Sequence, residues 1–238
     1  MDGFTTILIE CDNIKSLGSS CERDLYNIYQ NLILNQADSK NIFILTNNSM
    51  FFTNRNIKTN IYNNSVIEFE NILKSSNIKN LYIHISGHGY QGSDARHIEL
   101  DNRCEQIVLS SGIFTDYQFN DMLVKYLKKD TNLRISVDTC HSGTFSNFTN
   151  QIISKDMKIQ ATKKSPYFIN AYSISACTDS QLDACDIGMV GFGGSLTVHL
   201  LEDNNFYEFL LGDPIKVKDN LNKKLILLSQ EAILLFDN

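Results

Sequence analysis

The sequence predicts an α/β fold in which helices cover both faces of one mostly parallel central sheet. Three observations favour this class. Short apolar runs recur along the 238 residues, they alternate with stretches of helical periodicity, and no Pro-rich or Gly/Ser-rich linker interrupts a chain that is 42% hydrophobic. Strands that alternate with helices pair in parallel through right-handed crossovers. A chain of this length can bury one sizeable core, so we expect a single domain over residues 1–238.

The apolar runs define five strands. They are rich in Ile, Val, Phe and Tyr, and their nearly continuous apolarity is typical of strands that are covered on both faces. In chain order they lie at residues 5–10, 41–46, 81–86, 133–138 and 167–175. Two helices are expected between them, at 20–34 and 116–127, where apolar side chains recur at helical spacing behind acidic first turns.

Three segments break this alternation. Residues 91–113 are polar, and we expect a long loop or a hairpin excursion there. Residues 149–166 are polar and carry four lysines, which predicts an exposed linker loop between a larger part, about 1–148, and a smaller part, 167–238. The C-terminal run 225–236 contains a polar break, so a closing hairpin and a helix with an edge strand both stay open.

Charge and hydropathy exclude several partners. The formal net charge is −6 and the basic residues are scattered, so we expect no nucleic-acid partner. No apolar stretch reaches the length of a membrane span, and the start of the chain lacks a signal-peptide pattern. We therefore expect a cytoplasmic protein with no membrane partner. In that reducing compartment the six cysteines should be free thiols.

Two reactive side chains directly follow predicted strands. His88 lies in Ser-Gly-His-Gly after residues 81–86, and Cys140 lies in Asp-Thr-Cys-His-Ser-Gly after residues 133–138. Parallel strands deliver such residues to one edge of a sheet. An imidazole can activate a thiol at neutral pH, and the glycines beside His88 leave the amide of Gly89 free to approach a substrate oxygen. The sequence therefore predicts a cysteine hydrolase.

Other kinds of site are excluded by their spacing. His84 and His88 lack the helix and the intervening glutamate of a zinc peptidase, and Ser146 stands where a cysteine phosphatase needs arginine. The glycine-rich segment 191–195 has no lysine that could bind phosphate, so we expect a tight turn. Four histidines are expected to be structural or to lie on the surface: His84, His97, His141 and His199.

The motifs around the two reactive residues resemble those of the metacaspases, a family of caspase-like cysteine proteases. Residues 87–91 are similar to the family's GHGxQ, residues 175–181 to its SACxDxQ, and residues 194–197 to its GxxT. The interval between the histidine and the cysteine is also similar to the roughly fifty residues that separate them in caspases. The resemblance covers about residues 5–200.

This resemblance implies a caspase-like fold and an endopeptidase that cleaves after Arg or Lys, not after Asp. Cys140 would be the nucleophile and His88 the general acid and base, while the backbone amides of Gly89 and Cys140 would hold the oxyanion. Proteins or peptides would be the substrates, and the chain would act as a monomer. The lysines of residues 149–166 would suit self-cleavage.

The resemblance also implies an acidic specificity pocket. Cys21 and Asp24 resemble the C-x-x-D that opens the family's first helix, and Ser86 and Asp138 would complete the pocket. Two partly desolvated carboxylates would select a cation, because a neutral ligand leaves them unpaired. Asp24 also suits the simpler role of a first-turn acid that stabilises its helix.

The chain departs from the family at its calcium-binding positions. Tyr117 stands in place of the second aspartate of a pair, and Asn147 in place of another aspartate. Calcium prefers six to eight oxygen ligands, so lost carboxylates weaken its binding. The chemistry itself needs no cofactor, and we expect calcium to be a weak activator or none. Four acidic residues stay as candidate ligands of a site that is otherwise unknown: Asp94, Asp101, Glu105 and Asp116.

Two other functions stay open. A catalytically silent caspase-like module would bind partners or act as a decoy, although it has no chemical need for both His88 and Cys140. A related thiol hydrolase or transpeptidase would act after another residue, and the acidic pocket distinguishes it from a protease with a basic preference. No Pro-rich or zinc-binding leader precedes the first strand, so we expect no regulatory prodomain within this chain.

Overall fold

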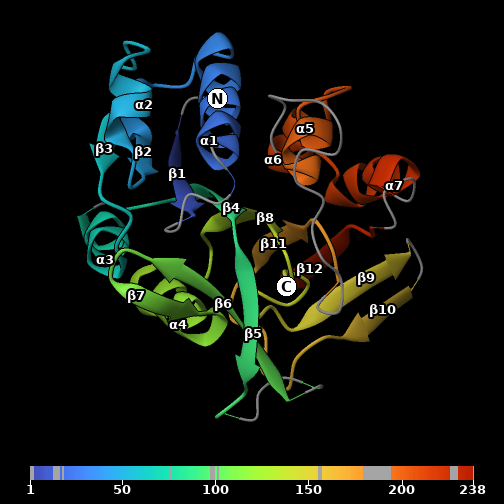
Figure 1. Cartoon of the computed structure of the whole chain (residues 1–238). Helices are drawn as coiled ribbons and strands as arrows, with labels where there is room; N and C mark the ends of the chain where they lie inside the picture. The colour runs from blue at the N-terminus through green and yellow to red at the C-terminus, as the bar shows by residue number, and fades with distance from the viewer. Residues whose placement is uncertain are drawn as a thin grey trace.

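The chain folds into one large sheet with helices on both faces, which confirms the predicted α/β class (Figure 1). This computed structural model describes residues 3–12, 17, 19–75, 77–96, 100, 102–154, 157–178, 194–225 and 230–237. The large sheet contains β1 (Phe4–Cys11), β2 (Ile42–Leu45), β3 (Asn60–Tyr62), β4 (Asn80–Gly87), β8 (Asn132–Thr139), β9 (Asn150–Ser154), β10 (Met157–Gln160), β11 (Asn170–Ser175) and β12 (Ile233–Asp237). Their order is β10-β9-β12-β11-β8-β4-β1-β2-β3.

Two groups of helices lie on opposite faces of this sheet (Figure 1). One group comprises α1 (Ser20–Leu34), the short α2 (Ser49–Thr53), α5 (Ser195–Leu200), α6 (Asn205–Leu211) and α7 (Pro214–Leu225), and the other comprises α3 (Val66–Ser75) and α4 (Asp116–Tyr126). A short 3-10 turn, Ser39–Asn41, precedes β2. The bounds of α1 agree with the predicted helix, and α4 begins at the predicted residue because Thr115 and Gln118 form a capping box.

Three central strands, β1, β4 and β8, are parallel and pair without a shift in register. Cys11 lies beside Gly87, and Gly87 lies beside Thr139. These are the last residues of the three strands, so the carboxyl ends form one level edge. The residues that follow each strand therefore leave the sheet next to one another.

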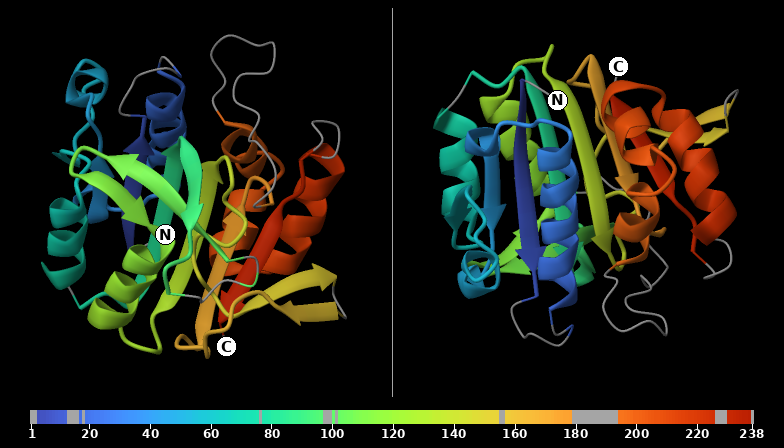
Figure 2. Two further views of the ribbon diagram at one scale, coloured as in Figure 1. Left: turned by 60° about the horizontal axis from the view of Figure 1, so that its bottom comes forward. Right: turned by 90° about the horizontal axis from the view of Figure 1, so that it is seen from above.

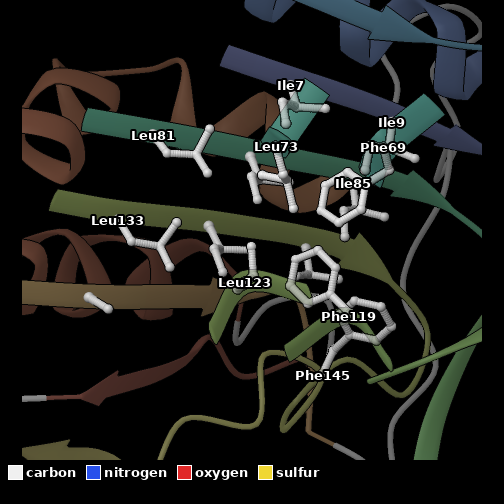
Figure 3. Close-up of a cluster of buried hydrophobic side chains, with 14 of the residues drawn as sticks. Ile7, Ile9, Phe69, Leu73, Leu81, Ile85, Phe119, Leu123, Leu133 and Phe145 are labelled. Atoms are coloured by element: carbon white, nitrogen blue, oxygen red, sulfur yellow. The ribbon is translucent and has the colours of Figure 1, made fainter. Parts of the chain in front are cut away.

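One face of these strands is apolar and packs on α3 and α4 (Figure 3). The side chains labelled in Figure 3 come from the three strands (Ile7, Ile9, Leu81, Ile85 and Leu133), from α3 (Phe69 and Leu73), from α4 (Phe119 and Leu123) and from the segment after β8 (Phe145). All of them are almost completely buried. Burial of each such side chain stabilises the fold by about 1.5–3 kcal/mol.

The opposite face of β4 and β8 carries buried polar side chains that bond to one another. Tyr82 Oη lies 2.7 Å from Ser136 Oγ, and Ser136 Oγ lies 2.8 Å from Nδ1 of His84. On its other side, His84 Nε2 lies 3.3 Å from the hydroxyl of Thr197 in α5, which donates to the carboxylate of Asp138. Buried polar groups are costly unless they are hydrogen-bonded, so this chain of bonds lets polar residues occupy the centre of the sheet.

Residues 149–166 are not the exposed linker loop that the sequence predicted. Within them β9 and β10 form an antiparallel hairpin, and β9 pairs with β12 (Figure 2, where the hairpin is yellow and β12 red). Ile152 of β9 is buried, whereas β10 is an exposed edge strand. Exposed edge strands carry charged and polar residues, so their sequence looks like that of a loop.

The other expected segments differ in detail. Residues 91–113 contribute to a three-stranded antiparallel sheet of β5 (Gly89–Ser93), β6 (Arg103–Leu109) and β7 (Gly112–Thr115), so the hairpin alternative is right. The fifth predicted strand begins only at Asn170. In the C-terminal run 225–236, α7 ends at Leu225 and residues 226–229 lie outside the described ranges, so the choice between the two alternatives there is not made. The strand β12 lies between β11 and β9 and not at the edge of the sheet.

Two further expectations concern the cysteines and the membrane. The cysteines within the described ranges are thiols that form no disulfide: Cys11, Cys21, Cys104, Cys140 and Cys177. Cys185 lies outside these ranges. Among the described residues, none of the helices combines the length and the apolar character that a membrane crossing requires.

We predict that His84 makes the fold sensitive to mild acid. Burial lowers the pKa of His84 from its ordinary 6.5 to about 3, so below pH 6.5 the unfolded chain takes up a proton that the folded chain does not. At about pH 5 this costs about 2 kcal/mol of stability relative to neutral pH. In urea unfolding, the pH dependence of His84→Gln should be weaker than that of the wild type by this amount. His199→Gln is the control, because His199 bonds to Glu202 on the surface; an equal pH dependence in both variants would contradict the prediction.

Candidate active site

His88 and Cys140 directly follow the carboxyl ends of neighbouring strands. Gly87, the last residue of β4, is the register partner of Thr139, the last residue of β8. Adjacent strands lie about 4.8 Å apart, so the two residues that come next leave the sheet side by side. Cys140 is half-buried and the His88 side chain is 26% exposed, so both are accessible from solvent.

Gly89 brings the backbone after His88 against the backbone of Cys140. A Cβ atom at Gly89 would clash with the carbonyl oxygen of Cys140 and would lie 2.8 Å from Oγ1 of Thr139. Only glycine permits this approach. The two residues whose amides the resemblance assigns to the oxyanion therefore lie on adjoining pieces of backbone.

The imidazole of His88 lies next to an acid that the sequence analysis did not single out. His88 Nε2 is 3.7 Å from Oδ1 of Asp12, and the backbone N–H of His88 donates to the carbonyl of Cys11 at 3.2 Å. Asp12 directly follows β1 and is 3% exposed, and its Oδ2 accepts the N–H of Leu17 at 3.0 Å. An acidic residue immediately after an apolar run was the signal that could have revealed it.

Three of the four expected pocket residues surround Gly194. The carboxylate of Asp24 accepts the hydroxyl of Ser86 at 2.6 Å and the N–H of Gly194 at 3.0 Å. Ser86 is the register partner of Asp138, and a Cβ atom at Gly194 would clash with the Asp138 carboxylate. Both carboxylates are about 1% exposed, so they lie beneath this backbone segment.

Helix α5 begins over the carboxylate of Asp138. Oδ2 of Asp138 accepts the N–H of Thr197 at 2.7 Å, and Oδ1 of Asp138 accepts the N–H of Leu196 at 3.4 Å. These bonds satisfy amides that have no partner within a helix. Cys21, the fourth expected pocket residue, lies one turn before Asp24 on α1, and burial raises the pKa of its thiol far above the usual range.

Two of the four candidate calcium ligands meet between β6 and α4. The N–H of Glu105 donates to Oδ2 of Asp116 at 3.1 Å, and the Glu105 carboxylate accepts the hydroxyl of Thr144 at 2.7 Å. Both acids are buried, and burial raises the pKa of Asp116 to about 6. Asp94 instead bonds within the turn after β5, and Asp101 lies outside the described ranges.

Asn147 lies against Asp116 and leaves its own polar atoms unsatisfied. Its side chain lies close enough to Asp116 to lower the pKa of that carboxyl, but its Oδ1 and Nδ2 are buried without a partner at ordinary hydrogen-bond geometry. Two carboxylates and one amide offer fewer oxygens than the six to eight that calcium prefers. Where the chain is described, no three His, Cys, Asp or Glu side chains gather as a metal site.

Comparison with known proteins identifies the family. A family model described as "Metacaspase, peptidase C14 domain" matches residues 6–149, which is more than half of the chain and includes His88 and Cys140. The chain is 28% identical over 167 residues to Metacaspase-1 of Plasmodium falciparum (isolate 3D7). That match covers 63% of this chain and 27% of the relative, so the chain spans about a quarter of that protein's length.

A solved structure shows the same fold at low sequence identity. The chain is similar to the crystal structure of protein GSU0716 from Geobacter sulfurreducens, with a TM-score of 0.57 and 16% identity, over 93% of this chain and 88% of the other. At that identity the likeness concerns the fold alone. With the family match over residues 6–149, these findings confirm the resemblance seen in the sequence: the chain belongs to the metacaspase family, peptidase C14 domain.

Proposed function

We propose that this chain is a cysteine endopeptidase of metacaspase type in which Cys140 is the nucleophile and His88 the general acid and base. One observation carries the proposal: the two residues follow register partners, Thr139 and Gly87, at the level ends of neighbouring parallel strands. Membership of a peptidase family supports protein or peptide substrates.

The proposed reaction has two halves. The thiol of Cys140 gives its proton to His88, and the thiolate attacks the carbonyl carbon of the scissile bond while the amides of Gly89 and Cys140 stabilise the oxyanion. The C–N bond breaks, His88 gives the proton to the leaving amine, and a thioester stays on Cys140. Water then gives a proton to His88 and attacks the thioester, which releases the acid product and restores the thiol.

We assign a preference for Arg or Lys before the cleaved bond to Asp24 and Asp138. Two buried carboxylates favour a cation strongly over a neutral group. Their described bonds are to hydroxyls and backbone amides, which include the amide of Gly194. A carboxylate offers about four acceptor positions, so an incoming cation would share these oxygens with the segment above them.

Calcium and self-cleavage belong to the same proposal. We expect calcium to be a weak activator or none, because Glu105, Asp116 and Asn147 supply few oxygens.

Self-cleavage needs an accessible segment, and most of residues 150–160 is paired in the sheet. Lys163, which is exposed and lies outside the strands, is the best suited of the lysines there. We further propose that the protein acts as a monomer in a reducing, cytoplasmic setting.

Peptide turnover tests the proposed reaction directly. We expect hydrolysis of fluorogenic peptides that end in Arg or Lys, little hydrolysis after Asp, and similar rates with and without calcium. Cys140→Ala and His88→Ala should each lower turnover at least about 1,000-fold, because the nucleophile or its base is lost. Cys104→Ser, at a buried cysteine of β6, is the matched control and should keep activity. No turnover by the wild type under any condition would favour the silent binding module.

The specificity pocket is tested by Asp24→Asn. Asparagine keeps an oxygen that can accept the bonds of Ser86 and Gly194, so the fold should be retained while the charge is lost. We expect kcat/KM for Arg peptides to fall about 100-fold. The rate at which iodoacetamide alkylates Cys140 should be the same in this variant as in the wild type. Asp121→Asn, at an exposed acid of α4, is the control; an equal effect of both variants would sink the assignment.

Because Asp116 is buried beside Glu105, we predict that Asp116→Asn changes the free energy of unfolding in a pH-dependent way. The pKa of Asp116 is raised from 3.8 to about 6, so its ionisation destabilises the fold, with no effect below about pH 4 and the full effect above about pH 6. Asparagine resembles the neutral acid. The variant should therefore gain about 1–3 kcal/mol of unfolding free energy at about pH 7.5 and lose this gain near pH 4. Denaturant titration at both pH values measures it, and a gain that is equal at both would refute the assignment.

A further inference from the structure

We propose that Asp12 is a positioning residue for His88, which turns Nδ1 of the ring toward Cys140 and stabilises the protonated ring. This inference rests on the proposed function, in which His88 takes the proton of Cys140. It adds a third member to a pair that sequence motifs alone define.

The register of the sheet puts these three residues in one row. The first residue after β1 is Asp12, the first after β4 is His88, and the first after β8 is Cys140. Those last residues are partners in a ladder without a shift. His88 therefore stands between an acid on one neighbouring strand and a thiol on the other.

The orientation of the ring follows from its contact with Asp12. Nε2 is the nitrogen that faces the carboxylate, at 3.7 Å from Oδ1. A carboxylate at Nε2 favours the tautomer that carries its proton there and leaves Nδ1 as the base. The present separation is longer than a hydrogen bond, and such contacts in free enzymes commonly shorten when substrate binds.

The Asp12 carboxylate is itself held in place. Its Oδ2 accepts the N–H of Leu17 at 3.0 Å, and its own backbone N–H donates to Oε1 of Glu10 at 3.0 Å. Because Asp12 is almost fully buried, little of its charge is screened by water. A fixed, poorly screened carboxylate can stabilise an imidazolium without reorganising when the proton arrives.

The groups around this pair leave Asp12 as the acid that acts on the ring. Glu10 bonds instead to Thr46 and to the amide of Asn47, and burial raises its pKa. From α1, the thiol of Cys21 is kept neutral by burial. From β5, the Tyr90 ring lies 6.2 Å from the His88 ring, centroid to centroid. The thiol of Cys11 donates to the carbonyl of Ser86. Cys140, from the segment after β8, is a further titratable neighbour within the described part of the chain.

Asp12→Asn and Asp12→Ala test the proposal by peptide turnover. We expect kcat to fall about 10-fold in Asp12→Asn and about 100-fold in Asp12→Ala, with KM changed less than about two-fold, because the ring and not the substrate is affected. Glu22→Gln is the matched control, because Glu22 is also a buried acid but accepts its hydrogen bond from the amide of Asn48, away from Asp12 and His88. It should stay within about three-fold of the wild type. A wild-type kcat in Asp12→Asn, or an equal loss in Glu22→Gln, would overturn the proposal.

Alkylation of Cys140 separates this inference from the proposed function. The rate of iodoacetamide labelling, followed by mass spectrometry of the Cys140 peptide, reports the thiolate whether or not peptides are cleaved. Loss of the carboxylate weakens the imidazolium, so Asp12→Asn should be labelled about ten-fold more slowly than the wild type at pH 6 and equally fast at pH 9. Failure of peptide turnover in the wild type would count against the protease alone, whereas identical labelling profiles would refute the role of Asp12.

Discussion

The unshifted parallel pairing of β1, β4 and β8 is the constraint on which the rest of the structure depends. It makes the carboxyl ends of three strands level, so the residues after them form a row at one edge. A slip of one residue in any of these strands would turn its side chains to the other face of the sheet. The contact of His88 with Asp12, the approach of Gly89 to Cys140 and the pairing of Ser86 with Asp138 would then all be lost.

The two faces of these strands have different roles: one packs the apolar core, and the other carries polar groups next to the proposed pocket. The face toward α3 and α4 is apolar and supplies the packed core. The face toward α1 and α5 holds a line of buried polar groups that runs from Tyr82 through His84 to the carboxylate of Asp138. Such a line is tolerated only when its members are bonded to one another, so it fixes where α5 sits as well as where Asp138 points.

The pocket joins parts of the chain that lie far apart in the sequence. Asp24 comes from α1, Ser86 and Asp138 come from the central strands, and Gly194 comes from the segment before α5. The family match ends at residue 149, before Gly194. Gly194 and the start of α5, which cover both carboxylates, therefore lie outside the matched region, and they contribute backbone amides and the hydroxyl of Thr197.

The sequence by itself determined the α/β class, the five main strands, the bounds of α1 and the positions of His88 and Cys140, because apolar periodicity and glycine-flanked motifs are local signals. Only the tertiary structure decided which residues meet. The hairpin β9–β10 looked like a loop because an edge strand carries polar residues, and its place in the sheet depends on pairing with β12, far along the chain. Asp12 gained its place beside His88 only through the register between β1 and β4, which is set by the packing of whole strands; the apolar run before Asp12 marks the end of a strand but not which strand lies next to it.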